Sequence, residues 1–270
     1  MNTDSWLATA LNTAPDSENQ IHSDELAKEY GFKGGLVPGV TVSAYLLHPV
    51  IESLGKEWLE RGYADCKITS PLYDGENFEV FLEAHKQGHI NTFLKNHEGK
   101  IVANAESQLL VNQPPAPRYR GDPLVEDNFE APVASFEIWE RLKNEGCRAF
   151  KFEWGGENPL IYLSDEKKLP KLLQPKDVGY ANLCFLLGCS NWILAGNAFM
   201  NPWVHLQTKS KNYKPVSLGT TLIAEMSVMD FYEKKGHEFI EVNVNLFEDK
   251  SLQCCMSINL LAIFKLRNNK

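Results

Sequence analysis

The 270-residue sequence predicts an α+β fold made of two similar units, each a central helix wrapped by an antiparallel sheet. Three observations lead to this prediction. Runs with strand character separated by short turns occur in both halves, and an apolar helical segment precedes most of the strands in each half. In addition, several residue groups recur about 140 positions apart. Pro71 and Gly75, for example, return 144 positions later as Pro215 and Gly219.

The first half begins with a polar stretch over residues 1–15, which we expect to be loosely held. A short helix is predicted from Ser23 to Tyr30, with Ser23 as its cap. An apolar helix opens at Gly39, and Pro49 should end or kink it and start a second helix that stops at Gly62. Four strands joined by short turns are then predicted over residues 66–71, 76–86, 89–96 and 100–111.

The proline-rich, polar stretch Gln113–Pro123 is typical of a linker. We therefore divide the chain into an N-terminal unit over residues 1–113, a linker over 114–128 and a C-terminal unit over 129–270. The second unit repeats the plan of the first, with helices predicted over 135–146 and 178–195 and strands over 147–154 and 222–264. Glu18-Asn19 and Glu157-Asn158 are a further repeated pair.

Composition excludes several classes of function. The net charge is −8 and there is no basic block, so we expect binding neither to nucleic acid nor to an anionic membrane surface. The six cysteines show no CxxC spacing, which predicts free thiols and no metal site. The N-terminus lacks the pattern of a signal peptide, and the apolar run 181–195 is too short to span a bilayer. These features predict a cytoplasmic protein without a cofactor.

The stretch from Asp16 to Leu47 contains most of the candidate functional residues. A polar strip holds the lone histidine His22, and a glycine-rich turn leads to the helix that opens at Gly39. A helix N-terminus presents unpaired N–H groups and a partial positive charge, so the turn would bring a titratable imidazole close to a ready-made oxyanion site. By contrast, we interpret His85, His89 and His97 as solvated residues of two hairpin turns.

The same stretch resembles the MaoC-like dehydratases, which include the (R)-specific enoyl-CoA hydratases, also called hydratase 2. Their motif reads Asp-x-Asn-Pro-hydrophobic-His, and the segment Asn19–His22 is similar to its second part. Ala27 follows the histidine by five residues, and GFKGGLVPGV leads into the helix, as in the family. Ser17 stands where the family has aspartate and Gln20 where it has proline, while Asp16 lies one position earlier. The resemblance implies a double hotdog fold.

It also implies the hydration of a 2-enoyl thioester, or the dehydration of a 3-hydroxyacyl thioester, carried by coenzyme A or an acyl carrier protein. His22 and Asp16 would be the acid–base pair, Asn19 would orient the site, and the thioester carbonyl would meet Gly39, with Gly35 and Val40 beside it. The second unit lacks the histidine and would hold the acyl chain.

Two alternatives to this function stay open, namely a non-catalytic acyl-thioester-binding protein, which Ser17 favours, and a hotdog thioesterase. Asn19 could instead only bond a neighbouring backbone group, and Asp16 could be a turn residue. Both a monomer and a homodimer are compatible with two units in one chain.

Overall fold

The computed structural model describes residues 5–84, 88–155 and 160–267. The strands of this part are β1 Ser5–Thr9, β2 Gly62–Ile68, β3 Asn77–Ala84, β4 His89–Asn96, β5 Ile101–Leu109, β6 Phe150–Trp154, β7 Val204–Asn212, β8 Thr220–Lys234, β9 His237–Glu248 and β10 Cys254–Lys265. The helices are α1 Asp24–Glu29, α2 Gly39–Arg61, α3 Phe136–Glu145 and α4 Leu183–Asn197, with short 3₁₀ turns η1 Gln20–His22, η3 Glu166–Lys168 and η4 Lys171–Leu173.

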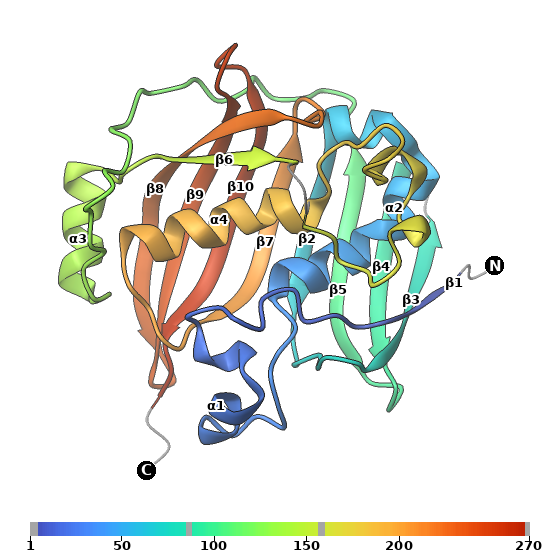
Figure 1. Ribbon diagram of the computed structural model, residues 1–270, viewed down its shortest axis with the longest axis horizontal. Helices are drawn as coiled ribbons and strands as arrows, with labels where there is room; N and C mark the ends of the chain where they lie inside the picture. Colours follow the sequence, from blue (N-terminus) through green and yellow to red (C-terminus); the bar gives the residue numbers. More distant parts are fainter. Residues whose placement is uncertain (1–4, 85–87, 156–159, 268–270) are drawn as a thin grey trace.

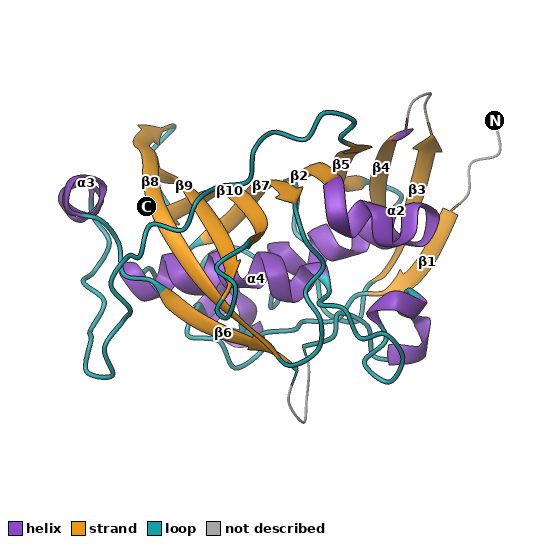
Figure 2. Cartoon of the chain, turned by 90° about the horizontal axis from the view of Figure 1, so that it is seen from above, coloured by secondary structure: helices purple, strands orange, loops and turns teal. Residues whose placement is uncertain are grey.

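The strands form one antiparallel sheet in the order β1-β3-β4-β5-β2-β7-β10-β9-β8-β6 (Figure 1). The sheet curves around α2 and α4, and the edge strands β1 and β6 turn toward the side of the helices (Figure 2). The second half of the order repeats the first in reverse, so two five-stranded units meet where β2 pairs with β7. This seam runs from Tyr63 opposite Lys211 to Lys67 opposite Gln207.

The repeat predicted from the sequence is also present in the backbone. Gly75 and Gly219, which lead into β3 and β8, both adopt left-handed φ angles, of 72° and 74°. Such angles favour glycine over residues with a side chain, which explains why the turn keeps a glycine in both copies. The prediction of an α+β fold with two helix-and-sheet units is therefore confirmed.

The two central helices are apolar over most of their surface because the sheet and the covering loops enclose them. Their N-terminal ends meet near the centre of the molecule, where Thr41 Oγ1 lies 3.3 Å from Cys184 Sγ. The predicted break of the first helix at Pro49 is wrong. Pro49 lies inside α2, and the only non-helical φ/ψ values within α2 occur at Gly55, whose φ of 60° glycine tolerates.

Two strands depart from the sequence prediction. The supposedly loose N-terminus contains β1, which pairs with β3 from Ser5 to Thr9. It is held by Trp6, whose ring stacks on the buried His48 of α2 with 3.9 Å between centroids. The second is β7, which the sequence did not predict, and it supplies the whole contribution of the second unit to the seam.

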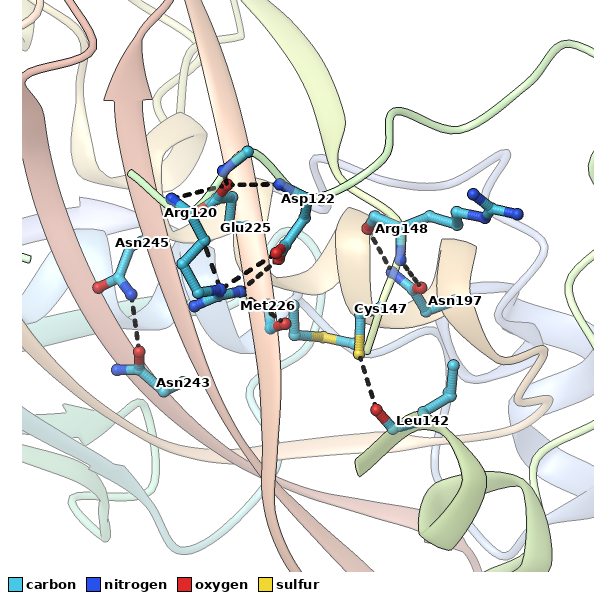
Figure 3. Close-up of polar contacts among 11 residues, drawn as sticks. Arg120, Asp122, Leu142, Cys147, Arg148, Asn197, Glu225, Met226, Asn243 and Asn245 are labelled. Carbon is cyan, nitrogen blue, oxygen red and sulfur yellow. Dashed lines mark hydrogen bonds and ion pairs between the residues drawn. The ribbon is translucent and has the colours of Figure 1, made fainter. Parts of the chain in front are cut away.

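The connection between the units is fastened to β8 by a buried carboxylate (Figure 3). Glu225 is fully buried, and it accepts hydrogen bonds from the backbone N–H groups of Arg120, Gly121 and Asp122 at 2.9, 2.7 and 3.0 Å. The guanidinium of Arg120 adds an ion pair to Asp122 and a hydrogen bond to the Met226 carbonyl. The predicted linker is thus an ordered strap, although the predicted unit boundaries themselves stay a prediction.

Several features of the described part bear on the earlier expectations. No described helix is long and apolar enough to cross a membrane. The six cysteines are buried free thiols, as predicted. His85 and the pair Glu157-Asn158 lie outside the described residues, whereas His89 and His97 are exposed on β4 and in the turn that follows it.

Candidate active site

A cavity of about 150 Å³ lies between the two units at the start of α2. Its walls come from η1, the beginning of α2 and the β2–β3 connection of the first unit, and from α4 and β7 of the second. Most of the lining is apolar, and the few polar side chains come from both units. They are Asn19, His22, Thr69, Ser70, Asn191 and His205. A mostly apolar hollow with a few convergent polar groups is typical of a small-molecule site.

The cavity lies where the seam ends. The described pairing of β2 with β7 stops at Lys67 and Gln207, while β7 continues to pair with β10 as far as Val204. The residues that follow the Lys67–Gln207 pair toward the end of the seam, Ile68 on β2 and Leu206 on β7, line the cavity. The cavity therefore lies at the end of the seam, where β2 no longer pairs with β7.

His22 is held in one orientation by the glycine-rich turn. Its Nδ1 lies 2.7 Å from the carbonyl oxygen of Leu36, and the Leu36 N–H donates to the carbonyl of Ile21 at 2.8 Å. Nδ1 must carry the proton to donate to that carbonyl, which leaves Nε2 with a lone pair. Burial lowers the pKa of His22 below 6.5, and the bond to Leu36 opposes the shift. The imidazole is therefore neutral at pH 7 and can accept a proton.

Close packing requires glycine at Gly35. A Cβ atom there would lie 2.5 Å from the carbonyl oxygen of His22, so a side chain would push the histidine away. The Gly35 N–H is already used, because it donates to Asp24 Oδ1 at 2.8 Å. Gly35 thus shapes the turn under His22, and its N–H is not available to a ligand.

The N-terminus of α2 differs from that of α4. In α4 the Asn182 side chain accepts from the Phe185 N–H at 3.0 Å and closes the helix end. In α2 the cap position is Pro38, which makes no side-chain cap. The first N–H groups of a helix lack an intrahelical partner, and Gly39 lines the cavity. The Gly39 N–H is therefore the suitable donor for a ligand oxygen, while Val40 is buried and is not among the described lining residues.

Asn19 is buried and joins the two units. Its Nδ2 donates to the carbonyl of Trp203 at 2.9 Å, and its Oδ1 accepts from the N–H of Trp203 at 3.2 Å. Both ends of the amide are thus committed to the loop before β7, so Asn19 ties that loop to the start of η1. Asp16, like Ser17 and Glu18, is exposed and is not among the described residues that line the cavity.

The two polar residues that the second unit contributes to the cavity were not singled out from the sequence, and neither were Thr69 and Ser70 of the first unit. His205, at the start of β7, lies against the first turn of α2, since a Cβ atom on Gly39 would be 2.7 Å from its Cγ. Its Nδ1 lies 3.1 Å from Oδ1 of Asn191, in the middle of α4. The one available signal was the polar side chain of Asn191 in the middle of a mostly apolar helical segment. Among the described residues, no group of three His, Cys, Asp or Glu side chains could hold a metal ion.

No protein-family model and no curated protein matches the sequence. Solved structures do match over nearly the whole chain. A double-hotdog protein from Mycobacterium tuberculosis has 10% identity and a TM-score of 0.57, with 97% of this chain and 96% of that chain covered. A protein assigned as a MaoC-domain dehydratase from Chloroflexus aurantiacus has 9% identity and a TM-score of 0.56, with coverage of 98% and 96%.

The dehydratase domain of PpsC from Mycobacterium tuberculosis, solved with C12:1-CoA, has 10% identity, a TM-score of 0.52 and coverage of 97% and 93%. Other matched chains are assigned as thioesterases, one of them from Thermobifida fusca. At this level of identity the comparison establishes the fold. The double hotdog that the resemblance implied is confirmed, and it is the fold of MaoC-type dehydratases.

Proposed function

We propose that this double-hotdog chain is a hydratase or dehydratase that interconverts a 2-enoyl thioester and a 3-hydroxyacyl thioester. The observation that carries the proposal is the pairing of two groups in one cavity. His22 offers a lone pair on Nε2, and the uncapped start of α2 offers the Gly39 N–H. Proton transfer and stabilisation of a developing oxyanion are the two requirements of this chemistry.

In the hydration direction, the oxygen of a water molecule bonds to C3 of the substrate. His22 Nε2 takes one proton from that water, and the electrons of the C2–C3 double bond move toward the thioester carbonyl. The Gly39 N–H stabilises the negative charge on the carbonyl oxygen, helped by the positive end of α2. His22 then returns the proton to C2 as the carbonyl re-forms, so the imidazole ends the cycle neutral.

The size of the cavity favours a short acyl group. A cavity of about 150 Å³ in another protein accommodates benzene, so roughly six carbon atoms fit in such a space. The four-carbon crotonyl thioester is therefore the first substrate to test. The cavity volume limits only the acyl group, so the coenzyme A ester can serve as the test substrate.

A second candidate is an acyl-thioester-binding protein without turnover. One observation favours it, since no acidic side chain is among the described residues that line the cavity. The predicted partner Asp16 is exposed, so His22 would have to take the proton from the water and return it to C2 without a carboxylate beside it. Turnover measurements separate this candidate from the proposed enzyme.

The experiment follows the absorbance of crotonyl-CoA near its enoyl-thioester band with the wild-type protein and with His22→Asn. Asparagine keeps an N–H that can donate to the Leu36 carbonyl but removes the basic nitrogen. We expect the absorbance to fall with the wild type, and we expect the rate of this fall to be about 10²-fold or more lower with His22→Asn. His89→Asn, the same exchange at an exposed position of β4, is the control and should retain full activity.

Free thiol is measured in parallel, after subtraction of the signal from the six cysteines of the chain. Release of coenzyme A would identify a thioesterase, because hydration releases no thiol. Binding of crotonyl-CoA without any change in absorbance would favour the non-catalytic candidate. Equal rates for wild type and His22→Asn would refute the role of His22.

A further inference from the structure

The second unit contributes a histidine whose hydrogen bonding is incomplete. His205 has only 6% of its surface exposed, and its Nε2 atom is buried without a partner. Seven buried side-chain atoms of the described residues lack a partner, and His205 Nε2 is the one that belongs to a lining residue of the cavity. Buried polar atoms are normally satisfied, so this atom calls for a partner that the protein itself does not provide.

Asn191 determines what kind of partner fits. Because its Oδ1 lies 3.1 Å from Nδ1 of His205, the ring proton resides on Nδ1 and donates to the amide oxygen. Nε2 then carries a lone pair and can only accept a hydrogen bond. Burial lowers the pKa of His205 to about 3, so the ring stays neutral at the pH of the cell.

His205 also stands directly beside the proposed oxyanion site. Its ring atoms Cγ and Cδ2 would lie 2.7 and 2.8 Å from a Cβ atom on Gly39, so the imidazole packs against the first residue of α2. A ligand whose carbonyl oxygen meets the Gly39 N–H therefore has the imidazole of His205 close to its next carbon atoms. In a 3-hydroxyacyl thioester, C3, which carries the hydroxyl group, is the second carbon atom after the carbonyl carbon.

We propose that His205, oriented by Asn191, accepts a hydrogen bond from the 3-hydroxyl group of the substrate and, in the reverse direction, from the attacking water. This inference rests on the proposed function and extends it, since it assigns a substrate-recognition role to the second unit. His22 receives the proton that moves, and His205 binds the hydrogen that stays on oxygen. An acceptor fixed on one wall also distinguishes the two enantiomers of the hydroxyl group.

The test measures binding, so it does not depend on turnover. His22→Asn serves as the parent protein because it should convert the hydroxylated ligands about 10²-fold or more slowly than the wild type. Dissociation constants are measured for butyryl-CoA and for both enantiomers of 3-hydroxybutyryl-CoA. We expect one enantiomer to bind roughly tenfold more tightly than butyryl-CoA, as one buried hydrogen bond would give. Adding His205→Phe, which keeps an aromatic ring against Gly39, should abolish this preference and leave butyryl-CoA binding within about twofold.

Asn191→Leu provides an independent variant, because it removes the bond that fixes the tautomer while His205 remains. It should weaken the preference in the same direction. The control is His89→Asn in the same parent, which should change nothing. Unfolding midpoints of all variants establish that they are folded.

The outcomes separate the two proposals. If the parent binds the hydroxylated and the saturated ligand equally well, the role of His205 is refuted while the hydration assay still decides the proposed function. If His205→Phe weakens all three ligands by the same factor, His205 has only a structural role and the inference also fails. If the parent binds none of the thioesters, the cavity is not a thioester site and the proposed function itself is refuted.

Discussion

Glu225→Gln should lower the free energy of unfolding by about 3 kcal/mol. The carboxylate is fully buried and accepts hydrogen bonds from three consecutive backbone N–H groups of the strap, at Arg120, Gly121 and Asp122. Hydrogen bonds to a charged acceptor contribute about 1 kcal/mol more than neutral ones, and three such bonds weaken together. The amide also turns an N–H toward one of the donors, which adds to the loss.

Denaturant unfolding is the direct measurement, and for a chain of this length the same loss lowers the melting temperature by about 5 °C. Glu233→Gln is the matched control, because Glu233 is exposed on the same strand β8. Trypsin should also cut faster after Arg120 in Glu225→Gln, as the strap is released. A loss below about 0.5 kcal/mol, equal to that of the control, would refute the view that this carboxylate anchors the strap.

Three further predictions concern the cavity and its surroundings. Gly39→Ala should reduce the hydration rate about 10²-fold in a folded protein. The new Cβ atom would lie only 2.7 Å from Cγ of His205 and would push the ring away, so unchanged kinetics would contradict this geometry. Asn19→Leu should cost about 2 kcal/mol of unfolding free energy, measured with denaturant, since two bonds to Trp203 are lost; Glu18→Leu, at the exposed neighbouring position, is the control. Burial lowers the pKa of His48 and of His205 to about 3, against 6.5 when unfolded, so these two residues bind two more protons in the unfolded chain between these values. Together they should leave stability unchanged above pH 6.5 and lower it toward acid by about 2.7 kcal/mol per pH unit, and His48→Gln should reduce the slope by about 1.4 kcal/mol per pH unit in unfolding experiments at pH 5.5 and 4.5.

A strand could be predicted from the sequence only where its inward-facing side chains are apolar. In β9 the buried side chains are mostly apolar, so the alternation is visible in the sequence. In β7 the buried side chains are His205, Thr208, Ser210 and Asn212, so the inward face looks polar. No hydrophobic period exists in such a strand, and the seam between the units could not be found without tertiary structure.

The two errors in the N-terminal half have local causes. Pro49 is a general helix breaker, yet α2 accommodates it, and the distortion occurs at Gly55, where a positive φ angle is inexpensive. The strand β1 is short and half exposed, and its stability comes from the contacts of Trp6 with His48 and Phe78. Neither partner is visible from the composition of the first fifteen residues.

The candidate site could be predicted only where its residues are close in sequence. His22 and the glycine-rich turn lie within one stretch, so a motif and a helix start indicated them together. The choice of Asp16 as a partner followed the same proximity, and the structure leaves Asp16 at the surface. Asn191 and His205 lie about 170 to 180 positions beyond His22 and reach the cavity through the seam and α4, which no local pattern encodes.

The position of the cavity, at the end of the seam between two units of one chain, has a consequence for how the protein behaves on dilution. A site shared by two separate subunits disappears when the protein concentration falls below their dissociation constant. Here both walls of the cavity belong to one chain, and the strap held by Glu225 fixes the effective concentration of one unit for the other. We therefore expect ligand binding in this cavity to be independent of protein concentration, down to amounts at which a two-chain site would already have come apart.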